Sequence, residues 1–414
     1  MLSKSYISFF LLVFLTINLH ASAVLDTVLL KKIKTIAENV GRKEVPDQRT
    51  DIFNFEVTGA ERPRVELETT LPQALEKLSA AFAKEGLQVD VVEHLLPSAA
   101  LEGQVYGVVR LSVANNRKSP AHYAEMVTQM ILGTPVQILK REKGYSLVRS
   151  PDRYISWVET EALAVMDASG FEQWRRADKL VYSEDYGSAY SRADMTSERV
   201  SDLVKGDLLK LLGKEKKFYK VAYPDGRIAF IPLKAAQKYK QWISRPNPDA
   251  QQILATAKTL IGIPYLWGGT SMKGVDCSGF TKTSFFLNGV ILPRDASQQA
   301  LIGEPVDIYE GDTVSLSKCL KNLQAGDLLF FAAAKGRAVH PRVTHTAIYM
   351  GNGEFIQSAG MVRINSMVPS TADYADFQSR TLVSARRILN EIGSPQITRI
   401  DQHELYIQPT NNEQ

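Results

Sequence analysis

Two stretches in the middle of the chain repeat each other at a constant distance of 73 residues. The matching positions share glycine, aromatic, Pro-Asp or alternating apolar character: Gly133 and Gly206, Tyr145 and Phe218, Pro151-Asp152 and Pro224-Asp225, and residues 155–158 and 228–231. Short alternating strands joined by Gly, Pro and Asp turns predict a small β-barrel for each copy rather than helices. The sequence therefore contains two copies of one β-rich module. A chain of 414 residues leaves room for further domains on both sides of them.

The strand pattern of this repeat resembles that of bacterial SH3 domains. We expect the first SH3-like domain at residues 105–166 and the second at residues 177–240. Such modules act as spacers, bind cell wall or shape a neighbouring active site. The second copy also carries a lysine cluster, which fits a solvated face or contact with an acidic polymer. Its members are Lys205, Lys210, Lys214, Lys216, Lys217 and Lys220.

The first 23 residues have the layout of a secretory signal peptide. Lys4 supplies a positive charge, residues 7–17 are apolar, and Ala21-Ser22-Ala23 offers the small side chains of a cleavage site. An uncleaved anchor helix is the alternative, but the apolar stretch is short for a bilayer. We therefore expect a signal peptide at residues 1–23, a periplasmic or secreted protein, and no stable membrane insertion after cleavage.

Composition excludes further classes of function. The formal net charge is only +4, so no basic excess indicates a nucleic-acid partner, and 44% hydrophobic with 23% charged residues is typical of a folded protein. Residues 24–104 show helical spacing at 25–40 and 71–85 and strand-like patterns at 53–57 and 87–92. This region is expected to form a small N-terminal α+β domain without recognisable chemistry.

One of the two cysteines lies where a reactive thiol is expected. Cys277 stands between Asp276 and Ser278, at the point where a loop enters an apolar helical run. The positive N-terminal end of a helix stabilises a thiolate, which is the nucleophilic form of cysteine. Cys277 is therefore the candidate nucleophile. Two cysteines are too few for a disulfide framework.

A nucleophilic cysteine needs a base, and three histidines follow it in the chain. His340 is expected on a loop and His403 in a polar tail, whereas His345 lies in an expected strand over 344–350 and would be held rigidly. These three histidines are therefore the candidates for the base, and the ring of His345 is the one expected to be held rigidly.

The strand partner of His345 decides whether a third group can orient its ring. Residues 354–359 are expected to return beside it as the second strand of a hairpin. If the turn has three residues, 351–353, then the residue numbers of each cross-strand pair sum to 704. Gln357 then lies on the same side as His345, whereas a two-residue turn gives 705 and the opposite side. A triad with Gln357 therefore requires an odd loop or a bulge.

The motifs of this last domain together resemble the NlpC/P60 cysteine peptidases, which have a papain-like α+β fold and act on peptidoglycan stem peptides. The motifs are Tyr265-x-Trp267-Gly268-Gly269, Asp276-Cys277-Ser278-Gly279-Phe280, Pro293-Arg294-Asp295, Gly326-Asp327-Leu328 and His345-x-Ala347-Ile348-Tyr349-Met350-Gly351. The resemblance covers residues 245–395 and implies Cys277 as nucleophile, His345 as base and Gln357 in the third place. Many members have His there, but an amide oxygen also accepts a hydrogen bond.

The resemblance also implies a multidomain fold and a substrate. Two small SH3-like barrels and the N-terminal α+β domain would precede the papain-like catalytic domain, as in the family's γ-D-glutamyl-L-diamino acid endopeptidases, which cleave after L-Ala-γ-D-Glu. The first module would close the pocket, with Glu125 as a buried carboxylate on the free amine of L-Ala. The implied substrate contacts are Glu125, Tyr154, Tyr265, Asp276, Ser278, Asp295 and Ala296, the last replacing a common Ser. No metal or cofactor is implied.

Between Cys277 and His345 the chain is longer than is usual for the family, and the excess lies in residues 302–320. Cys319 falls in this insertion, which argues against a disulfide with Cys277 and for a small buried apolar role.

Three functions follow from these expectations. The first is an endopeptidase acting on released stem peptides with a free N-terminal L-Ala. The second is an amidase or endopeptidase acting on intact cell wall, which predicts an open cleft without the Glu125 contact. The third is a noncatalytic wall-binding protein, against which the presence of Cys277 and His345 speaks.

Overall fold

A computed structural model describes residues 27–58, 63–332 and 342–407, so the expected signal peptide and His340 lie outside the described residues. The chain divides into two compact units, residues 1–100 and 101–414. Within the described ranges no helix is long and apolar enough to cross a membrane.

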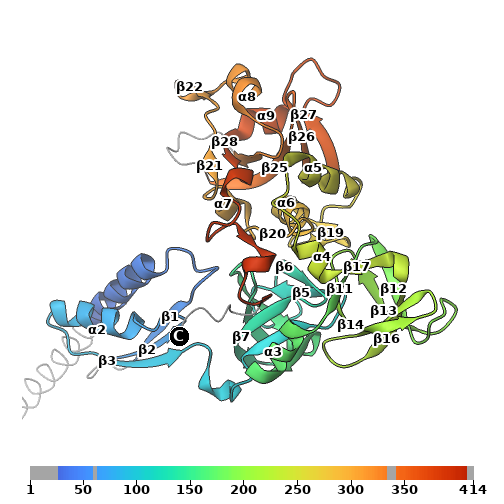
Figure 1. The fold of residues 1–414 in the computed structure, drawn as a ribbon. Coiled ribbons are helices and arrows are strands. Elements are labelled where there is room, and N and C mark those ends of the chain that lie inside the picture. The colour runs from blue at the N-terminus through green and yellow to red at the C-terminus, as the bar shows by residue number, and fades with distance from the viewer. Residues whose placement is uncertain (1–26, 59–62, 333–341, 408–414) are drawn as a thin grey trace, which may run out of the picture. The chain divides into compact units, whose positions relative to one another are not determined.

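The first unit combines a helix over residues 27–44 and α2 (Ala74–Lys84) with a three-stranded sheet. Strands β1 (Phe53–Thr58) and β3 (Asp90–Leu95) flank β2 (Arg64–Thr69), antiparallel and parallel to it, respectively (Figure 1). The third strand begins later than expected because residues 86 and 87 terminate α2. Gly86 has a φ of 68°, and the amide of Leu87 donates to the carbonyl of Phe82 at 3.0 Å.

Two seven-stranded antiparallel sheets open the second unit (Figure 1). The first consists of β4 (Tyr106–Val109), β5 (Val113–Arg117), β6 (Met126–Ile131), β7 (Pro135–Glu142), β8 (Tyr145–Arg149), β9 (Ile155–Glu159) and β10 (Leu163–Met166). The second consists of β11 (Lys179–Tyr182), β12 (Tyr186–Tyr190), β13 (Arg199–Val204), β14 (Leu208–Glu215), β15 (Phe218–Ala222), β16 (Ile228–Pro232) and β17 (Ala236–Lys238). Helix α3 (Ala168–Arg176) connects them.

The two sheets have the same topology. The first is ordered β10-β4-β7-β8-β9-β5-β6, and the second, read in the same sense, β17-β11-β14-β15-β16-β12-β13. Each strand of the second begins 73 residues after its counterpart, as the bounds above show. The repeat in the sequence is thus a repeat of structure.

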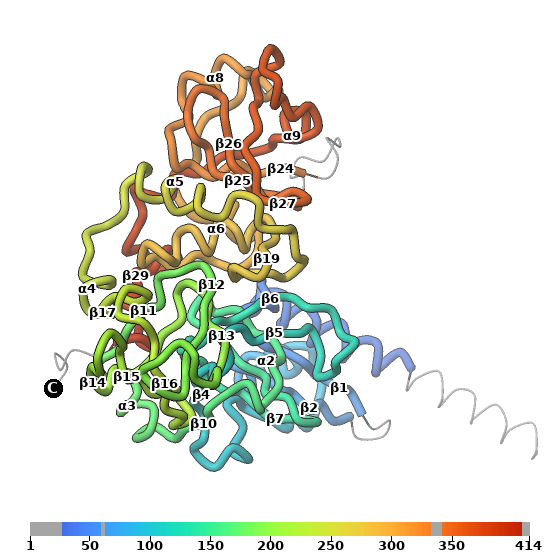
Figure 2. Tube along the Cα trace, turned by 90° about the vertical axis from the view of Figure 1, so that its right-hand side faces the viewer, coloured from blue at the N-terminus to red at the C-terminus, as the bar shows by residue number. Residues whose placement is uncertain are grey.

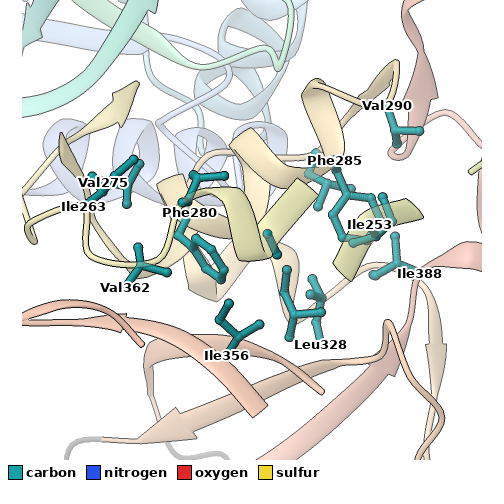
Figure 3. Packing of buried hydrophobic residues seen from close by; sticks show 14 of the residues in the cluster. Ile253, Ile263, Val275, Phe280, Phe285, Val290, Leu328, Ile356, Val362 and Ile388 are labelled. Carbon is teal, nitrogen blue, oxygen red and sulfur yellow. The ribbon is translucent and has the colours of Figure 1, made fainter. Parts of the chain in front are cut away.

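The remaining part of the second unit packs helices on a six-stranded sheet. Its strands, in sheet order, are β21 (Glu304–Pro305), β28 (Leu382–Arg387), β24 (Leu328–Ala332), β25 (Val343–Gly351), β26 (Glu354–Ala359) and β27 (Met361–Ser366). Helix α6 (Cys277–Phe286) lies on this sheet, where Phe280 packs over Ile356 and Leu328 (Figure 3). Helix α5 (Ala250–Thr259) adds Ile253 to the same core.

Shorter elements complete this part of the chain. They are α4 (Tyr239–Ile243), α7 (Ala296–Gln299), α8 (Leu316–Asn322), α9 (Asp376–Thr381), β18 (Thr270–Ser271), β19 (Gly274–Val275), β20 (Val290–Ile291), β22 (Tyr309–Glu310), β23 (Thr313–Val314) and β29 (Thr398–Arg399). The insertion carries β22, β23 and α8, and it buries Cys319 in a second core with Phe331 and Tyr349. Both cysteines are free thiols.

The C-terminal segment is not the polar tail expected from the sequence. Strand β29 pairs with β20 and lies beside α4 (Figure 2), where Arg399 donates to the carbonyl of Ile243 at 3.2 Å. Ile400 and Tyr406 are buried, and His403 Nε2 lies 2.9 Å from the carbonyl oxygen of Pro151. The apolar residues here are too widely spaced to form a helical or strand pattern, so only the tertiary contacts reveal their burial.

Candidate active site

The start of helix α6 positions Cys277. Asp276 caps the helix, accepting at Oδ1 from the amide of Gly279 at 2.7 Å. A Cβ on Gly279 would lie 1.9 Å from the carbonyl oxygen of Gly269, so only glycine fits beneath the Trp267-Gly268-Gly269 loop. The cap and this close approach hold the cysteine at the first helical position.

The thiol of Cys277 is buried, with 7% of the residue exposed. Burial, reinforced by the negative charge of Asp276, raises the pKa of Cys277 to about 11, although the backbone amides of Thr346 and Ser278 favour the thiolate. The helix-end amide of Ser278 favours the thiolate, as expected, but burial outweighs this contribution. The local motif revealed the helix terminus but not the depth at which the sulfur lies.

His345 and Gln357 lie on the same side of the β25–β26 hairpin. Ile348 pairs with Ile356 and Tyr349 with Phe355, after which Met350 is skipped and Gly351 pairs with Glu354. The turn therefore has two residues, but the bulge at Met350 shifts the register, so that the residue numbers of the pairs before it sum to 704. In this register Gln357 lies on the same side of the sheet as His345. His345 Nε2 lies 2.6 Å from Gln357 Oε1.

Cys277 and His345 are brought together through β25. The amide of Thr346, the neighbour of His345 in the chain, acts on the Cys277 sulfur, and the charge of Asp276 acts on both groups. Burial lowers the pKa of His345, while the hydrogen bond with Gln357 and the charge of Asp276 oppose that shift. At neutral pH the site therefore holds a thiol and a neutral imidazole.

Two residues of this site were missed as functional candidates. Arg294, fully buried, donates to Asp276 Oδ2 at 2.6 Å, to Ser278 Oγ at 2.9 Å and to Thr128 Oγ1 of β6 at 2.9 Å. Asn365 of β27 accepts at Oδ1 from Gln357 Nε2 at 2.8 Å. Arg294 belongs to the Pro293-Arg294-Asp295 motif, but nothing in the sequence indicated that it contacts Thr128 of the first sheet.

The segment just before β6 of the first sheet contacts the loop of residues 267–269 at Glu125. Trp267 Nε1 donates to Glu125 Oε1 at 3.0 Å, and Lys118 Nζ lies 3.8 Å from Oε2. The Glu125 side chain is 44% exposed, which corrects the expectation of a buried carboxylate. Tyr154 is buried.

The remaining candidates line the same region. Tyr265 is half-buried, and burial together with the charges of Cys277 and Asp276 raises its pKa. Asp295 begins helix α7, its amide donating to Gln298 Oε1 at 3.1 Å, and the buried Ala296 follows. In the part of the chain that the structure describes, no group of three or more His, Cys, Asp or Glu side chains could hold a metal ion.

Known proteins match the two parts of this site separately. The NlpC/P60 family model matches residues 262–381, and a model described as the bacterial dipeptidyl-peptidase Sh3 domain matches residues 116–163. A gamma-D-glutamyl-L-lysine dipeptidyl-peptidase of Bacillus cereus is 35% identical over 161 residues, which are 39% of this chain and 44% of that protein. Dipeptidyl-peptidase 6 of Lysinibacillus sphaericus is 27% identical over 274 residues, 63% of this chain and 91% of that protein.

A solved structure agrees with the fold. The crystal structure of an NlpC/P60 family protein from Bacillus cereus aligns with a TM-score of 0.57 and 23% identity over 69% of this chain and 99% of that one. The chain spans less than half the length of the Bacillus cereus dipeptidyl-peptidase. The range that the NlpC/P60 family model matches includes Cys277 and His345. A helix-capped cysteine beside a strand histidine, in a domain that this family model matches, means that the chain belongs to the NlpC/P60 family of cysteine peptidases, with a bacterial SH3 domain before the peptidase domain.

Proposed function

We propose that this protein is an endopeptidase that hydrolyses the bond between γ-D-glutamate and the diamino acid of peptidoglycan stem peptides, releasing L-Ala-γ-D-Glu from peptides with a free N-terminal L-Ala. The observation that carries the proposal is the hydrogen bond between Glu125 of the first barrel and Trp267 of the peptidase loop. It brings a carboxylate suited to an ammonium group to the domain that holds Cys277. The names of both curated relatives, which are dipeptidyl-peptidases, support the same chemistry.

The reaction uses the neutral pair of Cys277 and His345. Nδ1 of His345 takes the thiol proton as Sγ attacks the carbonyl carbon of the amide, so the thiolate forms only as the new bond forms. The oxyanion meets the amide of Cys277, which has no partner within the helix, and the hydroxyl of Tyr265. The diamino acid leaves with the proton from His345, and water then hydrolyses the thioester with His345 again as base.

Recognition of the substrate is assigned to both domains. Glu125 and Tyr154 would receive the L-Ala end, while Asp276, Ser278, Asp295 and Ala296 remain predicted contacts on the peptidase side. Asp276 and Ser278 also bind Arg294, so any contact they make with substrate comes from groups that are already fixed.

The domain arrangement and location complete the proposal. We assign domains to residues 24–104, 105–166, 177–240 and 245–395, and the strand order of the second sheet supports an SH3-like fold for it. We further propose that the protein works in the periplasm or after secretion. An amidase or endopeptidase acting on intact wall would not use the Glu125–Trp267 contact, which therefore favours the first function.

The test is mass spectrometry of products from L-Ala-γ-D-Glu-diaminopimelate and L-Ala-γ-D-Glu-L-Lys. Release of L-Ala-γ-D-Glu is expected from the parent protein, with a loss on the order of a millionfold in Cys277→Ala. Cys319→Ala is the matched control, because this cysteine lies in the second core, and it should retain activity. Turnover by Cys277→Ala near the parent rate would refute the assignment.

A further inference from the structure

We propose that Asn365 is a positioning residue that orients the Gln357 amide and thereby holds the proton of His345 on Nε2. The inference rests on the proposed role of His345 as the base, and it concerns a residue two hydrogen bonds away from the imidazole. Asn365 lies on β27, the edge strand next to Gln357 on β26.

The direction of the hydrogen bonds follows from a backbone carbonyl. Asn365 Nδ2 lies 3.2 Å from the carbonyl oxygen of Asp373, which can only accept, so the NH₂ group of Asn365 must point toward it. Asn365 Oδ1 then faces Gln357 and accepts from Nε2 at 2.8 Å. This leaves Gln357 Oε1 facing His345 Nε2 at 2.6 Å, where the imidazole must donate.

The orientation of the Gln357 amide determines which nitrogen of His345 can accept a proton from Cys277. With its proton on Nε2, His345 has a lone pair on Nδ1, which makes no hydrogen bond to any residue that the structure describes. That nitrogen can accept the proton of Cys277. If the Gln357 amide turned over, its NH₂ group would face Nε2 and favour the proton on Nδ1, where it would block proton transfer.

The carbonyl that sets this direction is itself fixed. The amide of Ser366 on β27 also donates to the carbonyl oxygen of Asp373 at 3.0 Å, and the amide of Ala375 donates back to the carbonyl of Ser366 at 2.9 Å. Gln357 is fully buried, so the protein, and not bulk water, determines which way its amide points.

Two substitutions of similar size separate orientation from packing. Asn365→Asp, with its carboxyl protonated toward the carbonyl oxygen of Asp373, keeps an acceptor for Gln357 Nε2, whereas Asn365→Leu leaves that amide free to turn over. We expect kcat to fall ~10- to 100-fold in Asn365→Leu, with KM within about twofold, and to stay within about threefold of the parent in Asn365→Asp. In a Gln357→Glu background, which has no amide to orient, Asn365→Leu should not lower kcat further.

A measurement without substrate separates this inference from the proposed function. ¹⁵N NMR of the ring of His345 should show the proton on Nε2 in the parent and in Asn365→Asp, and a mixture of tautomers in Asn365→Leu. Thermal unfolding of each variant checks the fold. The inference is overturned if Asn365→Leu keeps the parent tautomer, or if Asn365→Asp loses as much kcat as Asn365→Leu.

Discussion

At the scale of single residues, burial keeps Cys277 and His345, the proposed nucleophile and base, both neutral. The pKa of Cys277 is raised to about 11 and that of His345 is lowered from its usual 6.5, so the two pKa values move apart. A preformed thiolate–imidazolium pair would require the pKa of Cys277 to lie below that of His345. The proton therefore moves during attack rather than before it.

This arrangement predicts the pH dependence of both groups. A lowered pKa keeps His345 in its basic form at pH 7, so kcat/KM should stay level there and fall only as pH drops below 6.5 through the pKa of His345. Alkylation of the free protein by iodoacetamide should be slow at pH 7 and rise by roughly tenfold per pH unit toward pH 11, because only the thiolate reacts. Rapid alkylation that does not change between pH 5 and 8 would contradict this prediction.

Sequence reasoning found the residues whose signals are local. Cys277 follows a capping residue, and His345 and Gln357 share one hairpin, so a motif and the strand pattern named all three as candidates. The roles of Arg294 and Asn365 depend on Thr128 of β6 and on the carbonyl of Asp373, which lie in other elements. The raised pKa of the Cys277 thiol could not be predicted for the same reason, since burial is a property of the packed domain.

At the scale of elements, one bulge decides whether the third group can act. The sequence left two registers open for the hairpin of β25 and β26, and the Asn352-Gly353 turn alone would have favoured the register that separates Gln357 from His345. Skipping Met350 restores the other register. A bulge of this kind depends on contacts across the sheet, so the residues of the Asn352-Gly353 turn did not indicate the bulge at Met350.

Substitutions of Gln357 test whether this residue orients the ring of His345. Gln357→His should keep kcat within about tenfold, because an imidazole nitrogen can also accept from Nε2 of His345. Gln357→Leu should lower kcat by about 100-fold or more, since the ring loses its orienting partner. Steady-state kinetics on L-Ala-γ-D-Glu-L-Lys gives both values, and a Leu variant as active as the parent would remove Gln357 from the mechanism.

At the scale of the whole second unit, the first barrel is built into the active site. Gln129 of β6 accepts from the amide of Thr270 at 3.1 Å and from Ser271 Oγ at 2.9 Å, and Lys282 Nζ of α6 lies 2.8 Å from the buried Asp152. Breaking a buried ion pair is costly, so these contacts fix the barrel against the peptidase domain. The repetition of the two sheets could be predicted from the sequence repeat, whereas this docking could not, because it joins positions over 100 residues apart.

The docked barrel predicts a preference for peptides with a free N-terminal amine. Because Glu125 is half-exposed, its pairing with an ammonium group is worth about 1 kcal/mol, or roughly five- to tenfold, rather than the several kcal/mol of a buried pair. The parent should therefore cleave free L-Ala-γ-D-Glu-L-Lys about five- to tenfold faster than the N-acetylated peptide in kcat/KM. Glu125→Ala should slow the free peptide alone, whereas Glu142→Ala, an exposed carboxylate of the same barrel, should change neither rate. Equal rates of the parent protein on both peptides would instead assign it to intact cell wall.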